Sequence, residues 1–395
     1  MPRGPPSTAL VSGSPRLARQ PPTAQAAGRL RPKRKKVSSR PRVKRDPAVL
    51  PSQAKERKKA LQAHRQEACE GEGSAVLRNA AVQAGTLRRY HELLARFDQS
   101  VLSNLGKRLQ ALDIRRELDQ ALAEFMTELY WDGEGAHVAS ATLAAVGWQF
   151  PAASRFGDIR LPQSRQMLSG FIKLSPARTR LPLPIQVISL IGYFLVRAGH
   201  RRAAIGLWLA VTAYLRPGEM MLLTAQQVLP PSRGNLCPHW SLLLNPFELL
   251  IASKTGQYND TVWLDNPHHK FLLEPLAALK QQLRPEERLV DLSHQEFNAA
   301  FHEAARRAGL QALHPVPYHA RHSGASFDLV ANVRSLEQVK RRGRWMTDSC
   351  LNRYLKGGRL GEQFDRLSPA VQRNCCECHA RIGAILAGRW LGSLG

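Results

Sequence analysis

The sequence predicts a mainly α-helical protein with a small antiparallel β-sheet, in which two folded domains follow a basic N-terminal arm. Three observations favour this fold class: apolar residues recur at helical spacing along most of the chain, short strand-like segments gather between residues 240 and 265, and a proline-rich run at residues 175–184 separates two helical stretches. With 395 residues, of which 43% are hydrophobic, the chain is long enough to form two cores. A wholly disordered chain is therefore excluded.

The first predicted segment is a disordered basic arm at residues 1–74. Ten prolines between Pro2 and Pro51 interrupt any helix there, and few large apolar side chains are present to form a core. Lysine and arginine are dense between Arg31 and Arg45. Such a run is typical of a nuclear-import signal or of a non-specific DNA clamp, and a solvated tail without function is the third interpretation. We expect a nuclear protein.

The net charge points to a polyanionic partner. The chain holds 57 Lys and Arg against 31 Asp and Glu, which gives +26. The segment 1–70 carries +14 of this, from 18 basic and four acidic side chains, and the segment 71–395 carries the other +12. Because the folded part is also basic, nucleic acid or an acidic membrane face is the expected partner class.

Cysteine usage and hydropathy argue against a secreted or membrane protein. Six cysteines, three of them at Cys375, Cys376 and Cys378, do not form a disulfide framework, and the proline- and arginine-rich start of the chain is unlike a signal peptide. The most apolar stretch, 184–215, is interrupted by basic residues near His200 and is too short on either side to cross a bilayer. We expect a reducing compartment and no membrane partner.

Residues 75–174 are predicted to form a small helical domain. Apolar residues recur every three or four positions around residues 93–105 and 118–129, and the run Asp132-Gly133-Glu134-Gly135 is typical of a turn between two helices. We expect four or five helices in this domain. Prolines and arginines then make residues 175–184 an extended basic linker.

Residues 185–366 are predicted to form the second domain, and residues 367–395 a C-terminal helix and tail. The domain is expected to open with two apolar helices and a short third helix from Pro217, followed by the small sheet and then by further helices. The expected helices are 185–198, 201–214, 267–283, 294–309, 320–331, 335–341, 347–356 and 367–388, and the expected strands are 240–245, 249–253 and 261–265.

Four groups of basic and aromatic residues follow one another along this second domain. The first is Arg216 with Glu219, at a helix break where Pro217 begins the next helix. The second is Lys254, at the approach to a predicted hairpin turn. The third is the run Tyr318-His319-Ala320-Arg321-His322, and the fourth is Gly343-Arg344-Trp345 with Tyr354 nine positions after the tryptophan.

These residues resemble the motifs of the tyrosine recombinases, or phage-integrase superfamily, over about residues 80–370. The match is in the order of the groups and in their spacing, such as the interval from Arg321 to Trp345. The amino-acid sequences of the third and fourth groups look closest to those of recombinases of eukaryotic mobile elements of the DIRS and crypton kind. The resemblance implies a C-shaped clamp made of a helical core-binding domain and a catalytic domain. It also implies double-stranded DNA as the partner, a tetramer on two DNA sites, and integration of a mobile element.

The resemblance also implies a role for each residue. Arg216 and Arg321 would bind the phosphate, because a guanidinium matches two phosphate oxygens in one plane. Tyr354 would be the nucleophile that forms a 3′-phosphotyrosine, and Lys254 would protonate the leaving 5′-oxygen. Trp345 would donate its indole N–H to a phosphate oxygen, and Glu219 would support the site. No metal or other cofactor is implied.

One position departs from the family pattern. The resemblance implies that Tyr318 is also a catalytic residue, but it stands where histidine is usual: a phenol can donate or accept a hydrogen bond, yet with a pKa near 10 it is a poor base at neutral pH. His322 is four positions further on, hence on the same face of a helix, and is interpreted as a packing support.

Two alternatives from other functional classes remain. A type IB topoisomerase shares the fold and the attack chemistry, but it acts as a monomer and commonly has lysine where this chain has Tyr318. A decayed or domesticated recombinase would bind DNA without cutting it.

The run from Cys375 to His379 contains the spacing of a c-type haem attachment motif. A zinc site is a second interpretation of these thiols and His379, although no second cysteine pair is present. A packed helix that continues through Ile382, Ile385 and Leu386, against its own domain or a neighbouring subunit, is the third and favoured interpretation.

Overall fold

The computed structural model describes residues 78–79, 81–176, 180–232, 234, 236–246, 259–348 and 358–394. The predicted basic arm, the strand expected at 249–253 and most of the helix expected at 347–356 lie outside these residues. Residue contacts divide the chain into two compact units, Met1–Arg96 and Phe97–Gly395, and the boundary falls within the helix α3.

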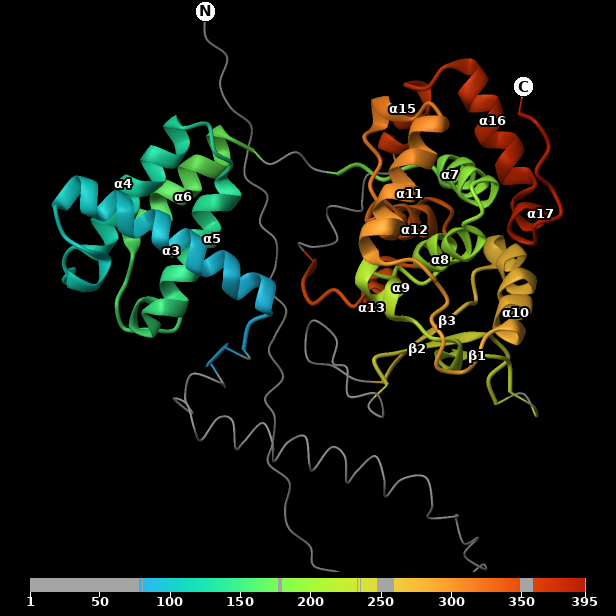
Figure 1. Ribbon diagram of the computed structural model, residues 1–395, viewed down its shortest axis with the longest axis horizontal. Coiled ribbons are helices and arrows are strands. Elements are labelled where there is room, and N and C mark those ends of the chain that lie inside the picture. Colours follow the sequence, from blue (N-terminus) through green and yellow to red (C-terminus); the bar gives the residue numbers. More distant parts are fainter. Residues whose placement is uncertain are drawn as a thin grey trace, which may run out of the picture. The chain divides into compact units, whose positions relative to one another are not determined.

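The described residues before Pro176 are helical, as the spacing of apolar residues predicts. They include α3 (Ala84–Leu105), α4 (Leu118–Trp131), α5 (Ala136–Gln149) and α6 (Pro162–Leu174), shown in blue to green in Figure 1. Helices α4, α5 and α6 pack on one another, and α4 buries an apolar stripe that includes Leu122, Phe125 and Leu129. The turn predicted after Trp131 joins α4 to α5, and Gly133 supplies its positive φ of +75°.

A side chain from α4 fixes the start of α6. The carboxylate of Asp119 accepts the backbone N–H groups of Gln163 and Ser164, each at 2.9 Å, and the Ser164 hydroxyl at 2.7 Å. These are N–H groups that a helix leaves without a partner in its own first turn. The contact therefore caps α6 and joins it to α4.

The residues after 180 form a mostly helical body. It contains α7 (Ile185–Arg197), α8 (Arg201–Thr212), α9 (Pro217–Leu222), α10 (Leu273–Gln282), α11 (His294–Arg307), α12 (His319–Val330), α13 (Leu336–Gly343), α15 (Gly358–Asp365), α16 (Pro369–Ala380) and α17 (Ile382–Leu386), together with a 3₁₀ helix at Pro267–Leu272. Figure 1 shows α7 and α8, in green, among the orange and red helices of the C-terminal half.

Helices α7 and α8 form the centre of this body. Ten residues on each of them are buried, and α7 contacts α8, α11, α16 and α17. A helix that is apolar around its whole circumference must be enclosed by protein or lipid. Within the described part of the chain, no helix has the length and apolarity that a membrane span requires.

The sheet is small, antiparallel and three-stranded, in the order β1 (Val228–Leu229), β2 (Ser241–Leu244) and β3 (Asp260–Trp263). In its register Leu242 lies opposite both Val228 on β1 and Val262 on β3. The strands expected at 240–245 and 261–265 are present with shifted ends. The two-residue strand β1 was not expected, because so short a segment shows no alternation of apolar and polar residues.

Two helix ends differ from the sequence-based expectation. Helix α8 ends at Thr212, and Tyr214 follows in the left-handed region with a φ of 50°. The single helix expected at 367–388 is divided at Arg381 into α16 and α17. This break lets the short helix α17 turn its apolar residues Ile382, Ile385 and Leu386 into the core of its own domain.

Candidate active site

The first predicted site residue, Arg216, lies immediately before α9 and is held by that helix. Glu219 in the first turn accepts the Arg216 backbone N–H at 2.8 Å through Oε2, and its Oε1 accepts Nη1 of the guanidinium at 2.6 Å. Pro217 fits the first position of the helix because it has no N–H to satisfy. Arg216 is 23% exposed, so its side chain is fixed and still accessible to a ligand.

The second predicted arginine, Arg321, is almost completely buried, with 1% exposure, on α12. Its Nη1 donates to the carbonyl oxygen of Tyr214, and its Nη2 donates to the carbonyl oxygen of Gly343. Helix α12 lies so close to α8 that a Cβ on Gly324 would overlap the carbonyl oxygen of Val211. The glycine thus permits the close approach that brings Arg321 to the end of α8.

Trp345 lies against Arg321. The guanidinium carbon of Arg321 is 4.6 Å from the centre of the indole ring, which is a cation–π arrangement. A Cβ on Gly343 would overlap the same indole, so only glycine fits there. Arg321 and Trp345, which come from separate sequence motifs, are therefore part of one packed unit.

Tyr214 connects these residues and was not identified as a site residue from the sequence. Its ring stacks on Trp345 with centres 6.2 Å apart, and the guanidinium of Arg342 lies 5.5 Å from the ring centre. Its hydroxyl donates to Asp328, and burial together with that carboxylate raises the pKa of Tyr214 well above its usual value. A non-glycine residue in the left-handed region costs about 1–2 kcal/mol. The surrounding contacts hold Tyr214 in that conformation, which turns its carbonyl oxygen toward Arg321.

A third arginine, Arg344, also reaches this site and was not predicted. Its Nη2 donates to Oε2 of Glu219 at 2.6 Å, so Glu219 binds Arg216 and Arg344 at once. Burial lowers the pKa of Arg344, Glu219 opposes that effect, and the positive charges of Arg321 and Arg216 lower it further. The available signal was its place between Gly343 and Trp345, but no sequence pattern shows where an arginine side chain points.

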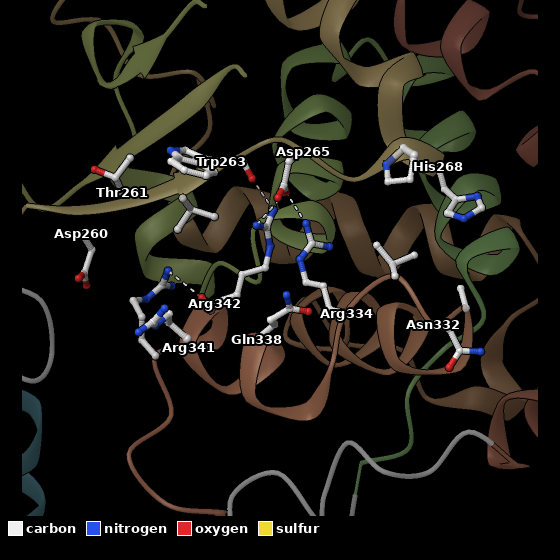
Figure 2. A pocket seen from close by; sticks show the side chains of 15 residues that line it. Asp260, Thr261, Trp263, Asp265, His268, Asn332, Arg334, Gln338, Arg341 and Arg342 are labelled. Atoms are coloured by element: carbon white, nitrogen blue, oxygen red, sulfur yellow. Dashed lines mark hydrogen bonds and ion pairs between the residues drawn. The ribbon is translucent and has the colours of Figure 1, made fainter. Parts of the chain in front are cut away.

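A layer of buried ion pairs supports the cluster from behind. Asp328 accepts hydrogen bonds from Arg334 and Tyr214, and from Nδ2 of Asn266 at 2.6 Å. Burial raises the pKa of Asp328, and the Arg334 charge opposes that shift most strongly. Figure 2 shows Asp265 between Arg334 and Arg342, both of which donate to it.

These ion pairs form one wall of a cavity of about 820 Å³ between β3 and α13. Arg341 and Arg344 line it together with Asp260, and Trp263 projects from β3, half exposed (Figure 2). With four arginines and two aspartates among its lining residues, this cavity is basic and suited to an anion.

Tyr318 lies at the start of α12, one turn before Arg321. Its ring is 5.1 Å from the ring of His322, and the guanidinium of Arg180 lies 5.6 Å from the Tyr318 ring centre. His322 is buried, with 6% exposure. The contacts that the structure gives Tyr318 therefore run along its own helix and to Arg180.

His319, beside Tyr318, is a neutral core histidine. Its Nδ1 accepts the backbone N–H of Val316 at 3.0 Å. Burial, with a further contribution from the positive charge of Arg180, lowers the pKa of His319 to about 4. The imidazole is therefore uncharged at neutral pH.

The remaining two predicted site residues, Lys254 and Tyr354, lie outside the described residues. The structure thus brings together Arg216, Glu219, Arg321 and Trp345. It adds Tyr214 and Arg344, and it places Tyr318 and His322 next to each other on α12.

The cysteine run lies on α16 with its side chains on different faces. Cys375 and Cys378 are fully buried in the core, and Cys376 is exposed. Burial raises the pKa of both buried thiols to about 12, which disfavours the thiolates that a metal needs. Nδ1 of His379 lies 2.9 Å from the Ser189 hydroxyl. Among the residues that the structure describes, no three His, Cys, Asp or Glu side chains are placed to bind a metal ion.

Comparison with known proteins gives matches among solved structures. No protein-family model matches the chain, and no curated protein matches it. A lambda integrase (75–356) dimer bound to a COC′ core site is 13% identical, over 72% of this chain and 93% of that one, with a TM-score of 0.47. An XerH site-specific recombinase bound to a palindromic difH substrate is 15% identical, over 65% and 72%, with a TM-score of 0.44. An XerA recombinase is 14% identical, over 77% and 95%, with a TM-score of 0.33. All three structures are tyrosine recombinases, the family that the four sequence motifs of this chain resemble.

Proposed function

We propose that this chain is a site-specific DNA recombinase, which cleaves and rejoins duplex DNA through a 3′-phosphotyrosine on Tyr354. The observation that carries the proposal is the arginine cluster. Arg216 and Arg344 share the carboxylate of Glu219, and Arg321 lies on Trp345 and donates to the Tyr214 carbonyl. Three guanidiniums with one carboxylate leave a positive site, which favours the phosphate of a DNA backbone.

The reaction follows from the charge that a phosphodiester develops during attack. Negative charge grows on the non-bridging oxygens of the phosphate, and fixed donors that face those oxygens stabilise the transition state. Arg216, which is partly exposed, is the donor that faces these oxygens, and the buried Arg321 contributes its positive charge, since both of its Nη atoms already donate to backbone carbonyls. Both are held by contacts that exist before DNA binds, so little reorganisation is required during the reaction.

Tyr354 and Lys254 complete the proposed chemistry. The Tyr354 phenol gives its proton to solvent water, and its oxygen bonds to phosphorus while the bond from phosphorus to the 5′-oxygen breaks. Lys254 gives a proton to that oxygen, which leaves as a hydroxyl. The indole N–H of Trp345 donates to a non-bridging oxygen. Attack of a 5′-hydroxyl from another strand reverses the steps and rejoins the DNA.

The proposal extends to the assembly and its setting. Exchange between two duplexes requires four active sites, so we propose a homotetramer on two DNA sites. The dense basic run between Arg31 and Arg45 supports a nuclear location. The amino-acid sequences of the third and fourth motifs support a role in the integration of a mobile element.

Covalent trapping on a nicked duplex tests the proposal. The nick lets the short fragment that bears the new 5′-hydroxyl diffuse away after cleavage, so the adduct accumulates and is seen by denaturing electrophoresis. The wild-type chain should form the adduct. Tyr354→Phe should form none while it retains DNA, because only the attacking oxygen is removed. Tyr130→Phe, a change of the same kind on α4, is the matched control and should behave like the wild type.

The alternatives give different results in the same assay. A decayed recombinase binds DNA and forms no adduct, which would contradict the proposal of catalysis. A type IB topoisomerase forms the adduct and relaxes supercoiled plasmid as a monomer, but does not join strands from two duplexes. Strand exchange between two duplexes therefore separates a recombinase from that enzyme.

A further inference from the structure

Arg344 has a backbone conformation that is unfavourable for an arginine. It follows α13 with a φ of 54°, in the left-handed region, and the N–H of Trp345 closes the helix end by donating to the Lys340 carbonyl at 3.1 Å. Glycine is the residue that such a helix end favours, since any other side chain is strained there. The backbone conformation therefore does not explain an arginine at this position, and its side-chain contacts must.

The contacts of Arg344 indicate that role. Its side chain is 11% exposed, and its Nη2 donates to Glu219 Oε2 at 2.6 Å and lies 3.5 Å from the Tyr214 carbonyl oxygen. The same Oε2 accepts the backbone N–H of Arg216, and the other carboxylate oxygen binds the Arg216 guanidinium. Arg344 thus fixes the group that fixes Arg216.

The charge balance gives the second argument. A carboxylate that binds a phosphate-clamping arginine opposes its attraction for phosphate. Arg216 and Glu219 alone sum to zero, and Arg344 restores one positive charge to the group. Without Arg344, the largely buried carboxylate of Glu219 would be left against Arg216 and would repel an incoming phosphate.

We propose that Arg344 is a positioning residue that orients Glu219 and neutralises its charge, so that Arg216 keeps its attraction for the scissile phosphate. This inference rests on the proposed function and adds a residue to the site that the motifs define. Arg344 acts through Glu219 and does not itself contact the phosphate.

A double-mutant cycle tests the coupling. Arg344→Met should slow adduct formation on the nicked duplex about tenfold to a hundredfold, the range for loss of a residue that orients another site residue. Glu219→Gln in the same chain removes the uncompensated carboxylate and should recover about tenfold of that loss. Glu219→Gln alone should have a smaller effect than Arg344→Met. If Arg344 contacts phosphate directly, the double variant will be no faster than Arg344→Met, and that result overturns the proposal.

Two further variants separate this role from folding. Arg344→Gly relieves the left-handed backbone, so its thermal unfolding should match or exceed the wild type while adduct formation falls as in Arg344→Met. Unchanged adduct formation in Arg344→Gly would overturn the proposal. Arg389→Met removes a surface arginine whose Nη1 and Nη2 both donate to the carboxylate of Glu274. It is the matched control and should change the rate less than twofold.

The readout also separates this inference from the proposed function. If the wild-type chain binds duplex DNA and forms no adduct, the catalytic proposal fails alone. The cycle is then measured as duplex affinity at low salt, because Arg216 is expected to bind phosphate in either case. The Glu219→Gln change should again recover affinity in the Arg344→Met background, and absence of recovery would contradict the coupling.

Discussion

At the scale of single residues, two of the six non-glycine residues with positive φ in the described part of the chain belong to the site. Tyr214 and Arg344 follow α8 and α13, and each adopts a conformation that costs about 1–2 kcal/mol. Such strain persists only where the surroundings impose it, and it concentrates at functional sites. Here Asp328, Arg321 and Glu219 impose it through hydrogen bonds to these two residues.

Single residues also show where sequence interpretation ends. Arg216, Glu219, Arg321 and Trp345 were predicted because their types, order and spacing resemble the motifs of the tyrosine recombinases. Arg344 was not predicted. Its proposed role depends on the carboxylate of Glu219, which lies far earlier in the sequence. Tertiary contacts of this kind leave no local periodicity.

Buried histidines predict a loss of stability in weak acid. Burial lowers the pKa of His319 to about 4 and that of His269 to about 3, so both are neutral in the folded chain and titrate near 6.5 when it unfolds. Their contribution to stability is complete above pH 6.5 and is lost as the pH falls toward 4. Each should reduce the free energy of unfolding by about 1.4 kcal/mol per pH unit in that window.

Urea unfolding between pH 7.5 and 5 measures this slope. His319→Asn keeps an acceptor for the Val316 N–H but does not titrate. The slope of the free energy of unfolding against pH should therefore decrease by the equivalent of about one bound proton. An identical slope in the wild type and His319→Asn would show that His319 does not titrate on unfolding.

At the scale of elements, close helix contacts determine where the arginines lie. The strongly apolar helices α7 and α8 were predicted with ends close to those observed, because uninterrupted burial leaves a clear pattern. Short elements were not: β1 is a two-residue strand, and the 3₁₀ helix at 267–272 was taken as part of one longer helix. In these elements tertiary packing outweighs any local preference.

The crossing of α12 over α8 gives a prediction at this scale. Gly324→Ala should destabilise the helical body that follows residue 180 by about 2 kcal/mol or more and displace Arg321, because the added methyl group overlaps the Val211 carbonyl. Gly170→Ala on α6 is the matched control, since no atom lies within 4 Å of its Cβ position. That change should be neutral or stabilising by about 0.5–1 kcal/mol.

Thermal and urea unfolding compare the two glycine variants. Equal stability of Gly324→Ala and the wild type would mean that the two helices can separate at no cost. The close approach would then not be what positions Arg321.

At the scale of the whole molecule, basic charge accompanies a fold made mostly of helices. The chain carries +26, and its arginine cluster is one part of a generally basic body. We therefore expect binding to duplex DNA to weaken steeply as salt rises, because each neutralised phosphate releases counterions. The fold class was predictable from periodicity and linker composition, whereas the placement of Tyr354, the proposed nucleophile, stays a prediction because this residue lies outside the described residues.

The central claim is that Tyr354 attacks a DNA phosphate held by the arginine cluster. Peptide mapping of the covalent adduct formed by the full chain on a nicked duplex tests it most directly. After proteolysis and mass spectrometry, the DNA fragment should be attached through its 3′-phosphate to the peptide that contains Tyr354. Attachment to the peptide that contains Tyr318, attachment through a 5′-phosphate, or retention of the duplex without any adduct would contradict the account.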